Sequence, residues 1–186
     1  EKFGVTIAVN SEYATRNNHS SLMVVREKLA NTFVCSSDNY FVKNPFEPYV
    51  YKAYYAVTYV DGPTEEWCVR MGAGNRIVDV QIGGADSHVM LGHVYFDREF
   101  SEAFRAILEA EYELPVTVDK LWEELFIDHI TELDMTARVY PEGDIYEFDT
   151  LDELREFDPM FLQNIDSEAF DNIVEALSCE KNDIRD

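Results

Sequence analysis

Phe33-Val34-Cys35-Ser36-Ser37-Asp38-Asn39 decides the fold expected for this chain, because an apolar strand runs directly into a carboxylate. Upstream, residues 5–9 have the composition of a buried strand, and Leu22, Val25 and Leu29 form a helical stripe. A strand, a helix and a second strand in this order predict a parallel pair joined by a crossover. Ligands bind beyond the carboxyl ends of such strands, so Asp38 stands where a site residue is expected.

A second acidic segment lies far along the chain, in Ile145-Tyr146-Glu147-Phe148-Asp149-Thr150. Alternation along a strand puts Glu147 and Asp149 on one face, where two carboxylates repel each other unless solvent or a metal ion separates them. If both segments lie in one sheet, these two residues and Asp38 converge into an oxygen-ligand site suited to Mg²⁺. Two alternatives stay open: Asp38 as part of an Asx turn, and Asp149 as an acidic residue near a helix N-terminus.

Length and composition bound the class of protein. With 186 residues and 46% hydrophobic residues, the chain can bury the core of one globular domain. Its formal net charge of −22 favours solubility and repels nucleic-acid backbones and anionic membranes, so neither is expected as a partner. Three widely spaced cysteines suit a reducing, cytoplasmic location better than a disulfide framework. No stretch approaches the roughly 20 apolar residues of a membrane span.

The remaining pattern predicts an α/β sandwich that is parallel at the front and more antiparallel in the middle. Gly72-Ala73-Gly74-Asn75 is a plausible hairpin turn, and Thr150 with Glu153 fits a capping box. The expected strands are 51–60, 66–71, 76–82, 88–96, 135–140 and 144–148, and the expected helices are 100–112, 120–130 and a tail over 157–177.

Among the aromatic residues, most are expected in the core, but Trp67 lies among Glu65, Glu66 and Cys68 near Gly62-Pro63. A Trp face attracts quaternary ammonium groups, and neighbouring carboxylates add to that attraction. The histidines show no metal-ligand spacing. The cysteines show no evident partner base for nucleophilic catalysis.

Taken in order, several of these segments resemble the bacterial nucleotidyltransferases of the phosphocholine cytidylyltransferase type. The resemblance covers residues from about 3 to about 157, and its most specific parts are the Ser-Asp-Asn and Tyr-Glu-Phe-Asp segments. The segments are Asn17-Asn18-His19-Ser20-Ser21-Leu22, Ser36-Ser37-Asp38-Asn39, Glu66-Trp67, Leu91-Gly92-His93-Val94-Tyr95-Phe96, Leu121-Trp122-Glu123-Glu124 and Ile145-Tyr146-Glu147-Phe148-Asp149.

The resemblance implies a Rossmann-like nucleotidyltransferase fold, a three-layer sandwich with a mixed sheet, over residues 1–157. The pattern of the residues themselves predicts a helical tail over 158–186. It implies Mg²⁺-dependent transfer of a cytidylyl group from CTP to phosphocholine, which gives CDP-choline and pyrophosphate. By match to the family, Asp38, Glu147 and Asp149 would be the catalytic residues that hold Mg²⁺.

The same resemblance implies an acceptor site. Trp67 would face the choline trimethylammonium group, and Trp122 lies in a segment that also approaches it. Tyr95 and Ser21 complete the substrate-binding candidates. The family often has a Tyr beside the second Trp, whereas this chain has Leu121, which leaves other phospho-alcohols open as acceptors.

One departure from the family concerns its first strand, Gly-rich loop with an Arg, and following Lys, which cradle the nucleotide phosphates and have no counterpart here. We therefore expect an incomplete chain without its N-terminal strands, weakly active or inactive, whose uncovered sheet edge invites self-association. Two alternatives remain: a sugar-1-phosphate nucleotidyltransferase of the same fold, and a non-catalytic remnant that acts as a binding protein.

Overall fold

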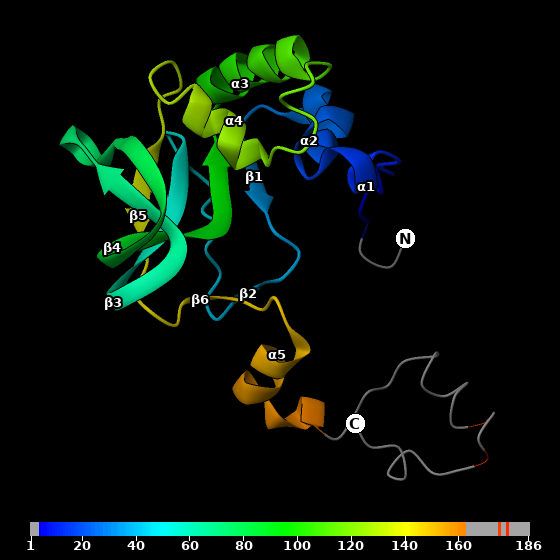
Figure 1. The fold of residues 1–186 in the computed structure, drawn as a ribbon, viewed down its shortest axis with the longest axis vertical. Coiled ribbons are helices and arrows are strands. Elements are labelled where there is room, and N and C mark those ends of the chain that lie inside the picture. The colour runs from blue at the N-terminus through cyan, green and yellow to red at the C-terminus, as the bar shows by residue number, and fades with distance from the viewer. Residues whose placement is uncertain (1–3, 163–174, 176–177, 179–186) are drawn as a thin grey trace. The chain divides into compact units, whose positions relative to one another are not determined.

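The computed structural model describes residues 4–162, 175 and 178 (Figure 1). The chain divides into two units, residues 1–147 and residues 148–186, which are described separately. The first unit contains helices α1 (Tyr13–Arg16), α2 (His19–Val25), α3 (Arg98–Glu111) and α4 (Trp122–Asp128) and strands β1 (Thr32–Cys35), β2 (Asn39–Phe41), β3 (Tyr54–Met71), β4 (Ile77–Phe96), β5 (Thr136–Val139) and β6 (Ile145–Glu147). The second unit contains α5 (Leu151–Phe157) and the 3₁₀ turn Pro159–Leu162.

The main sheet is mixed, as the sequence predicts. Its strand order is β1-β4-β3-β5. Strand β4 pairs antiparallel with both β1 and β3, whereas β3 and β5 run parallel. A separate two-stranded sheet joins β2 to β6 and places Asn39 opposite Glu147.

Two hydrophobic clusters cover opposite faces of the main sheet, because successive side chains of a strand point to opposite sides. Tyr55 and Val57 of β3 belong to the larger cluster, which α2, α3 and α4 complete. Tyr54 and Ala56 belong to the smaller cluster, to which β6 contributes Ile145. The first unit therefore has helices on one face of its sheet and the β2–β6 pair on the other (Figure 1).

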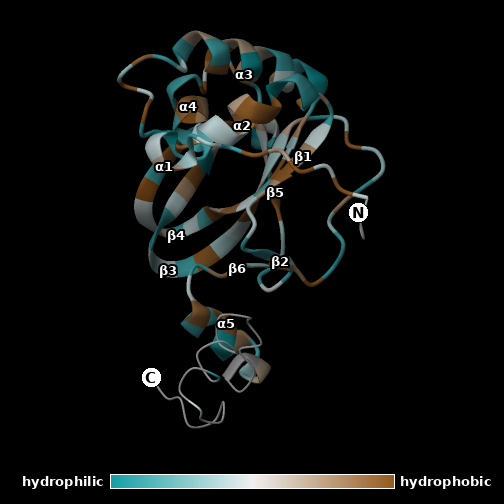
Figure 2. Ribbon diagram, turned by 90° about the vertical axis from the view of Figure 1, so that its right-hand side faces the viewer, coloured by the Kyte–Doolittle hydropathy of each residue, from teal (hydrophilic) through white to brown (hydrophobic). Residues whose placement is uncertain are grey.

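Helix α3 shows why the helical layer forms. Phe100, Phe104 and Leu108 recur every four residues and are buried, so they make one apolar stripe against the sheet. The helix carries both hydrophilic and hydrophobic residues along its length (Figure 2). Asp97 caps its first turn by accepting a hydrogen bond of 2.8 Å from the Phe100 N–H.

Strands β3 and β4 form one long hairpin, where the sequence predicts four separate strands. The predicted turn is confirmed, since the Gly72 N–H donates to the Arg76 carbonyl oxygen at 2.8 Å. The hairpin also curls, because Cys68 is paired with both Gln81 and Val89. A bridge between Arg76 and Thr136 brings the turn end of the hairpin to β5.

The prediction of a buried strand over residues 5–9 is wrong, and with it the parallel pair at the front of the sheet. A strand needs a partner for its backbone N–H and C=O groups, and within the described residues none pairs with this segment. Val5, Ile7 and Val9 are 66%, 84% and 80% exposed. Strand β1, expected to run parallel to that segment, instead pairs antiparallel with β4.

The second unit opens with the predicted capping box, which is confirmed. The Glu153 N–H donates to Thr150 Oγ1 at 3.2 Å, and the Thr150 N–H donates to Glu153 Oε2 at 3.1 Å. The predicted helical tail over 157–177 lies mostly outside the described residues. Within the described part of the chain, no helix is both long enough and apolar enough to cross a bilayer.

Candidate active site

The Ser36–Asn39 segment places Asp38 between two strands. Strand β1 ends at Cys35, and the Ser36 N–H then donates to the Gly92 carbonyl oxygen at 2.9 Å. Asn39 begins β2 directly opposite Glu147 of β6. Pairing of β2 with β6, two segments more than a hundred residues apart, therefore brings the Asp38 and Glu147 carboxylates together.

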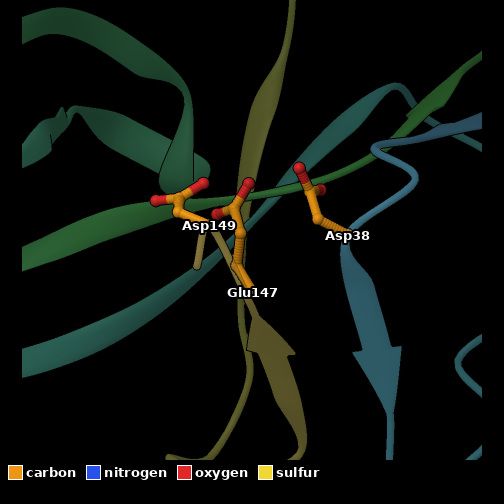
Figure 3. Close-up of side chains that lie close together, drawn as sticks. All are labelled: Asp38, Glu147 and Asp149. Atoms are coloured by element: carbon orange, nitrogen blue, oxygen red, sulfur yellow. The ribbon is translucent and has the colours of Figure 1, made fainter. Parts of the chain in front are cut away.

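The three predicted carboxylates gather in one place. Asp38, Glu147 and Asp149 each offer an oxygen atom, and these atoms lie within 4.8 Å of one another. Figure 3 shows the three side chains with their oxygen atoms turned to the same side. Asp38 Oδ1 is buried without a hydrogen-bond partner. A buried carboxylate oxygen costs free energy unless something satisfies it, so this donor set fits a hard divalent cation.

Gly92 leaves room for polar groups beside this cluster. Its φ of +55° is left-handed, and a Cβ built on it would lie 2.8 Å from Ser36 Oγ and 3.2 Å from both Asn39 amide atoms. Those two Asn39 atoms are buried without hydrogen-bond partners. Only glycine fits this close approach. The Asn39 amide atoms therefore lie beside the carboxylates without hydrogen-bond partners.

A half-buried polar network lies between Gly92 and the helical layer. The Gly92 backbone lies next to the Tyr55 hydroxyl, which donates to Glu123 Oε1 at 3.4 Å. Asn18 Nδ2 donates to Glu123 Oε2 at 3.2 Å, and the Trp122 N–H donates to Asn18 Oδ1 at 2.7 Å. Burial raises the pKa of Glu123 to about 7 and raises the pKa of Tyr55 well above its ordinary value.

Trp67 borders a cavity of about 210 Å³ between β3, β4 and the region of α4. The cavity is lined by Trp67, Val80, Gln81, Ile82, Lys120, Glu124, Ile127 and Asp128. It therefore combines one aromatic face with two carboxylates and one ammonium group. Lys120 Nζ is hydrogen-bonded to Asp128, so one of the two carboxylates already has a cationic partner.

The other three substrate-binding candidates lie in different surroundings. Trp122 is only 5% exposed and stacks on Tyr55 with ring centroids 5.9 Å apart, so its ring serves as a core group. Tyr95 is buried in the smaller cluster, on the opposite face of the sheet from Trp122. Ser21 Oγ accepts a hydrogen bond of 3.0 Å from Asn10 Nδ2. Trp122 and Tyr95 are thus more buried than Trp67, which is half-buried at the edge of its cavity.

Cys35 has a partner that the sequence does not reveal. Its Sγ lies 3.2 Å from His93 Nδ1, and His93 Nε2 lies 3.1 Å from the Tyr54 hydroxyl. Burial raises the pKa of the Cys35 thiol to about 11 and lowers the pKa of His93 to about 4. Both groups are therefore neutral near pH 7, which does not favour a nucleophilic thiolate.

No family model matches the chain. The choline-phosphate cytidylyltransferase of Streptococcus pneumoniae is 30% identical over 158 residues, which are 85% of this chain and 69% of that enzyme. The chain belongs to the nucleotidyltransferase family of the choline-phosphate cytidylyltransferases. The resemblance drawn from its motifs is confirmed, and the chain is a nucleotidyltransferase.

Other similar proteins support the assignment to this family. The solved structure of CTP:phosphocholine cytidylyltransferase from S. pneumoniae aligns with a TM-score of 0.79 and 29% identity, covering 86% of this chain and 70% of that one. A 2-aminoethylphosphonate cytidylyltransferase from Lancefieldella rimae is 27% identical over 83% of this chain and 64% of its own length. The inositol-1-phosphate CTP transferase from T. maritima, at 12% identity and a TM-score of 0.53 over 85% of this chain and 67% of that one, shares the fold. This nucleotidyltransferase chain spans about two thirds of the length of the curated relatives it matches.

Sequence reasoning missed two residues of the polar network, Tyr55 and Glu123. Tyr55 lies in an apolar run that predicts only a strand, and Glu123 looks like any acidic residue in the first turn of a helix. No signal in the sequence marks either residue, because their contact depends on how α4 packs on β3.

Proposed function

We propose that this nucleotidyltransferase transfers a cytidylyl group from CTP to phosphocholine, giving CDP-choline and pyrophosphate. The observation that carries the proposal is the convergence of Asp38, Glu147 and Asp149 in a chain 30% identical to a choline-phosphate cytidylyltransferase. A phosphate oxygen of the acceptor attacks the α-phosphorus of CTP, and the bond to pyrophosphate breaks. The reaction needs no protein nucleophile, in agreement with the neutral Cys35–His93 pair.

Asp38, Glu147 and Asp149 would hold Mg²⁺. When bound, the ion supplies positive charge that offsets the charge of the phosphate groups and orients them. The chain's own residues prepare the site: the Ser36–Gly92 hydrogen bond fixes the segment before Asp38, and the pairing of Asn39 with Glu147 fixes the second carboxylate. Positioning of this kind supplies a large part of the rate in such transfers.

The cavity beside Trp67 would receive the charged end of the acceptor. A Trp face and the Glu124 and Asp128 carboxylates attract a positively charged nitrogen, although Lys120 offsets part of that charge. Phosphocholine and 2-aminoethylphosphonate both carry such a nitrogen, one trimethylated and the other a primary ammonium. Because Leu121 replaces the Tyr that the family often has, the second acceptor class is the competing proposal.

The test is isothermal titration of this chain with CDP-choline in Mg²⁺, repeated in EDTA and with the Asp149→Asn variant. Binding that requires both Mg²⁺ and Asp149 supports the carboxylate site. Competition by choline, but not by ethanolamine, supports the trimethylammonium acceptor, and the reverse order supports the aminoethyl class. Binding that EDTA and Asp149→Asn leave unchanged would contradict the assignment of these carboxylates to a metal ion.

A further inference from the structure

The polar network between Glu123 and Gly92 has no role in the reaction as proposed so far, yet it ends beside the carboxylates. Tyr55 is fully enclosed in the larger hydrophobic cluster, except that its hydroxyl meets Glu123 on one side and the Gly92 backbone on the other. Glu147 lies close enough for its charge to raise the pKa of Tyr55 further. The Tyr55 hydroxyl thus stands between a buried carboxylate of α4 and a carboxylate of the proposed metal site.

The Gly92 peptide extends the link. Its backbone lies next to the Tyr55 hydroxyl, and its carbonyl oxygen accepts from the Ser36 N–H at 2.9 Å. Ser36 begins the segment that presents Asp38, and its Oγ lies near the space that a Gly92 Cβ would occupy. A displacement of Tyr55 would therefore shift the Gly92 peptide group and, through it, the segment that carries Asp38.

The other end of the network is anchored on two helices. Both polar groups of the Asn18 side chain are used: Nδ2 donates to Glu123 and Oδ1 accepts from the Trp122 N–H. The ring of Trp122 stacks on the ring of Tyr55. Glu123 is consequently held in place by Asn18, the residue before α2, and its second oxygen is directed at Tyr55.

From these contacts we propose that Glu123 is a positioning residue that acts through the Tyr55 hydroxyl to fix Gly92 and, with it, Asp38. The proposal rests on the proposed function, because it assumes that Asp38 binds a divalent cation. Breaking the link leaves the three carboxylates in the chain but allows Asp38 to move, so it weakens cation binding without abolishing it. Tyr55 is buried and its hydroxyl donates to Glu123, so loss of that partner is costly.

The test is titration of Mn²⁺ alone, followed by electron paramagnetic resonance, into the wild-type chain and into Glu123→Gln, Tyr55→Phe and the double variant. We expect Mn²⁺ affinity to fall about three- to tenfold in each single variant, less than the roughly 10–100-fold typical of a residue that contacts a metal ligand directly, because Glu123 and Tyr55 act through further groups. If Glu123 acts through Tyr55, the double variant binds no more weakly than Tyr55→Phe, because interacting sites are not additive. The exposed Glu102→Gln on α3 is the matched control and should bind like the wild type.

A second readout is the pH dependence of Mn²⁺ affinity, measured on the wild type and on Glu123→Gln. Burial brings the pKa of Glu123 to about 7. Its charged neighbours are Glu124 on the same helix and Glu147 beyond Tyr55, and Asn18, the residue before α2, is uncharged. Mn²⁺ affinity of the wild type should therefore rise between about pH 6 and 8, where ordinary carboxylates are already ionised, and Glu123→Gln should remove that rise.

The outcomes separate this inference from the function on which it rests. If Asp38→Asn loses Mn²⁺ while Glu123→Gln and Tyr55→Phe bind as tightly as the wild type at every pH, the positioning role is wrong and the metal site stands. If Asp38→Asn also binds Mn²⁺ like the wild type, the proposed metal site is wrong, and the positioning role with it. Additive losses in the double variant would show that Glu123 does not act through Tyr55.

Discussion

At the scale of single residues, Gly92 has the most demanding position in the described chain. It combines a φ of +55° with side-chain atoms at 2.8 Å and 3.2 Å from the place of a Cβ. The atoms it would meet belong to Ser36 and Asn39, on either side of Asp38. A change at Gly92 therefore affects stability and the site together.

Replacing Gly92 by Ala isolates this steric effect. We expect the free energy of unfolding to fall by about 1–3 kcal/mol more than it does in Gly74→Ala, because the added methyl group must displace packed atoms. Gly74 is the matched control, since its φ of +63° is similar but no atom lies within 4 Å of its Cβ position. The measurement is urea unfolding of both variants. Equal losses would mean that the Ser36–Asn39 segment yields without cost.

His129 carries a pH dependence of its own. Its Nε2 lies 2.7 Å from Glu111 Oε1 and its Nδ1 lies 3.0 Å from Glu132 Oε1, so only the doubly protonated ring can donate to both carboxylates. Burial lowers the pKa of His129, but the hydrogen bonds to Glu132 and Glu111 outweigh it and raise the pKa above its ordinary value.

The sign of the effect follows from linkage. Because the folded state binds the proton more tightly, the His129 contribution to stability is complete below the unfolded pKa of about 6.5 and is lost as pH rises through the folded pKa. We expect the difference in unfolding free energy between the wild type and His129→Gln to shrink as pH rises through that window. The control is the same His129→Gln change in a Glu111→Gln/Glu132→Gln background, where both carboxylate partners are gone and the difference should depend less on pH. A constant difference for His129→Gln would contradict the ion pairs.

At the scale of secondary-structure elements, the sequence correctly predicted the features that depend on contacts between residues close together in the chain. The Thr150–Glu153 capping box and the Gly72–Asn75 turn are hydrogen-bonded within a few residues and are confirmed. The strand over residues 5–9 is wrong because strand formation depends on a distant partner, which composition does not reveal. The role of Glu123 was not predicted for the same reason, because its surroundings depend on contacts with Asn18 and Tyr55, which lie on other parts of the chain.

Asp97 joins helix α3 to the segment just before strand β3. Its Oδ1 accepts from the Phe100 N–H in α3 and its Oδ2 accepts from the Ala53 N–H just before β3, both at 2.8 Å. We expect Asp97→Ala to lower the free energy of unfolding by about 2 kcal/mol, about 1 for the helix cap and about 1 for the second hydrogen bond. Thermal and urea unfolding should agree, and Asp119→Ala, at an exposed site, should cost less than about 0.5 kcal/mol. A loss for Asp97→Ala no larger than that would mean that water replaces both bonds.

At the scale of the whole molecule, the carboxylate site was predictable because chemistry limits what three acidic side chains can do together. The strand alternation proposed for Glu147 and Asp149 pointed to a shared face, although β6 ends at Glu147. The antiparallel β2–β6 pair that brings Asp38 to them had no local signal. Resemblance to the family indicated that these distant residues come together, and the 30% identity to one member supports that resemblance. The sequence pattern of this chain alone does not indicate it.

The net charge of the chain and its exposed apolar segment have opposite effects on self-association. Strand β1 is an edge strand of the main sheet, and Val5, Ile7 and Val9 add exposed apolar surface upstream of it. An unpaired edge favours association with a second copy, whereas a net charge of −22 repels one. Salt shortens the range of that repulsion to about 10 Å at 0.1 M and about 3 Å at 1 M. We therefore expect sedimentation velocity to show a monomer at low salt and a concentration-dependent dimer at high salt.

The location of the contact can be tested in the same experiment. Ile7→Asp should abolish the dimer at high salt, because it puts a charge in the middle of the exposed apolar segment. Ile82→Asp is the matched control: Ile82 is 74% exposed, close to the 84% of Ile7, but lies on the β3–β4 hairpin. The control should dimerise like the wild type, since both variants add the same charge. Loss of the dimer in both would show that net charge alone controls association, and persistence in both would place the contact elsewhere.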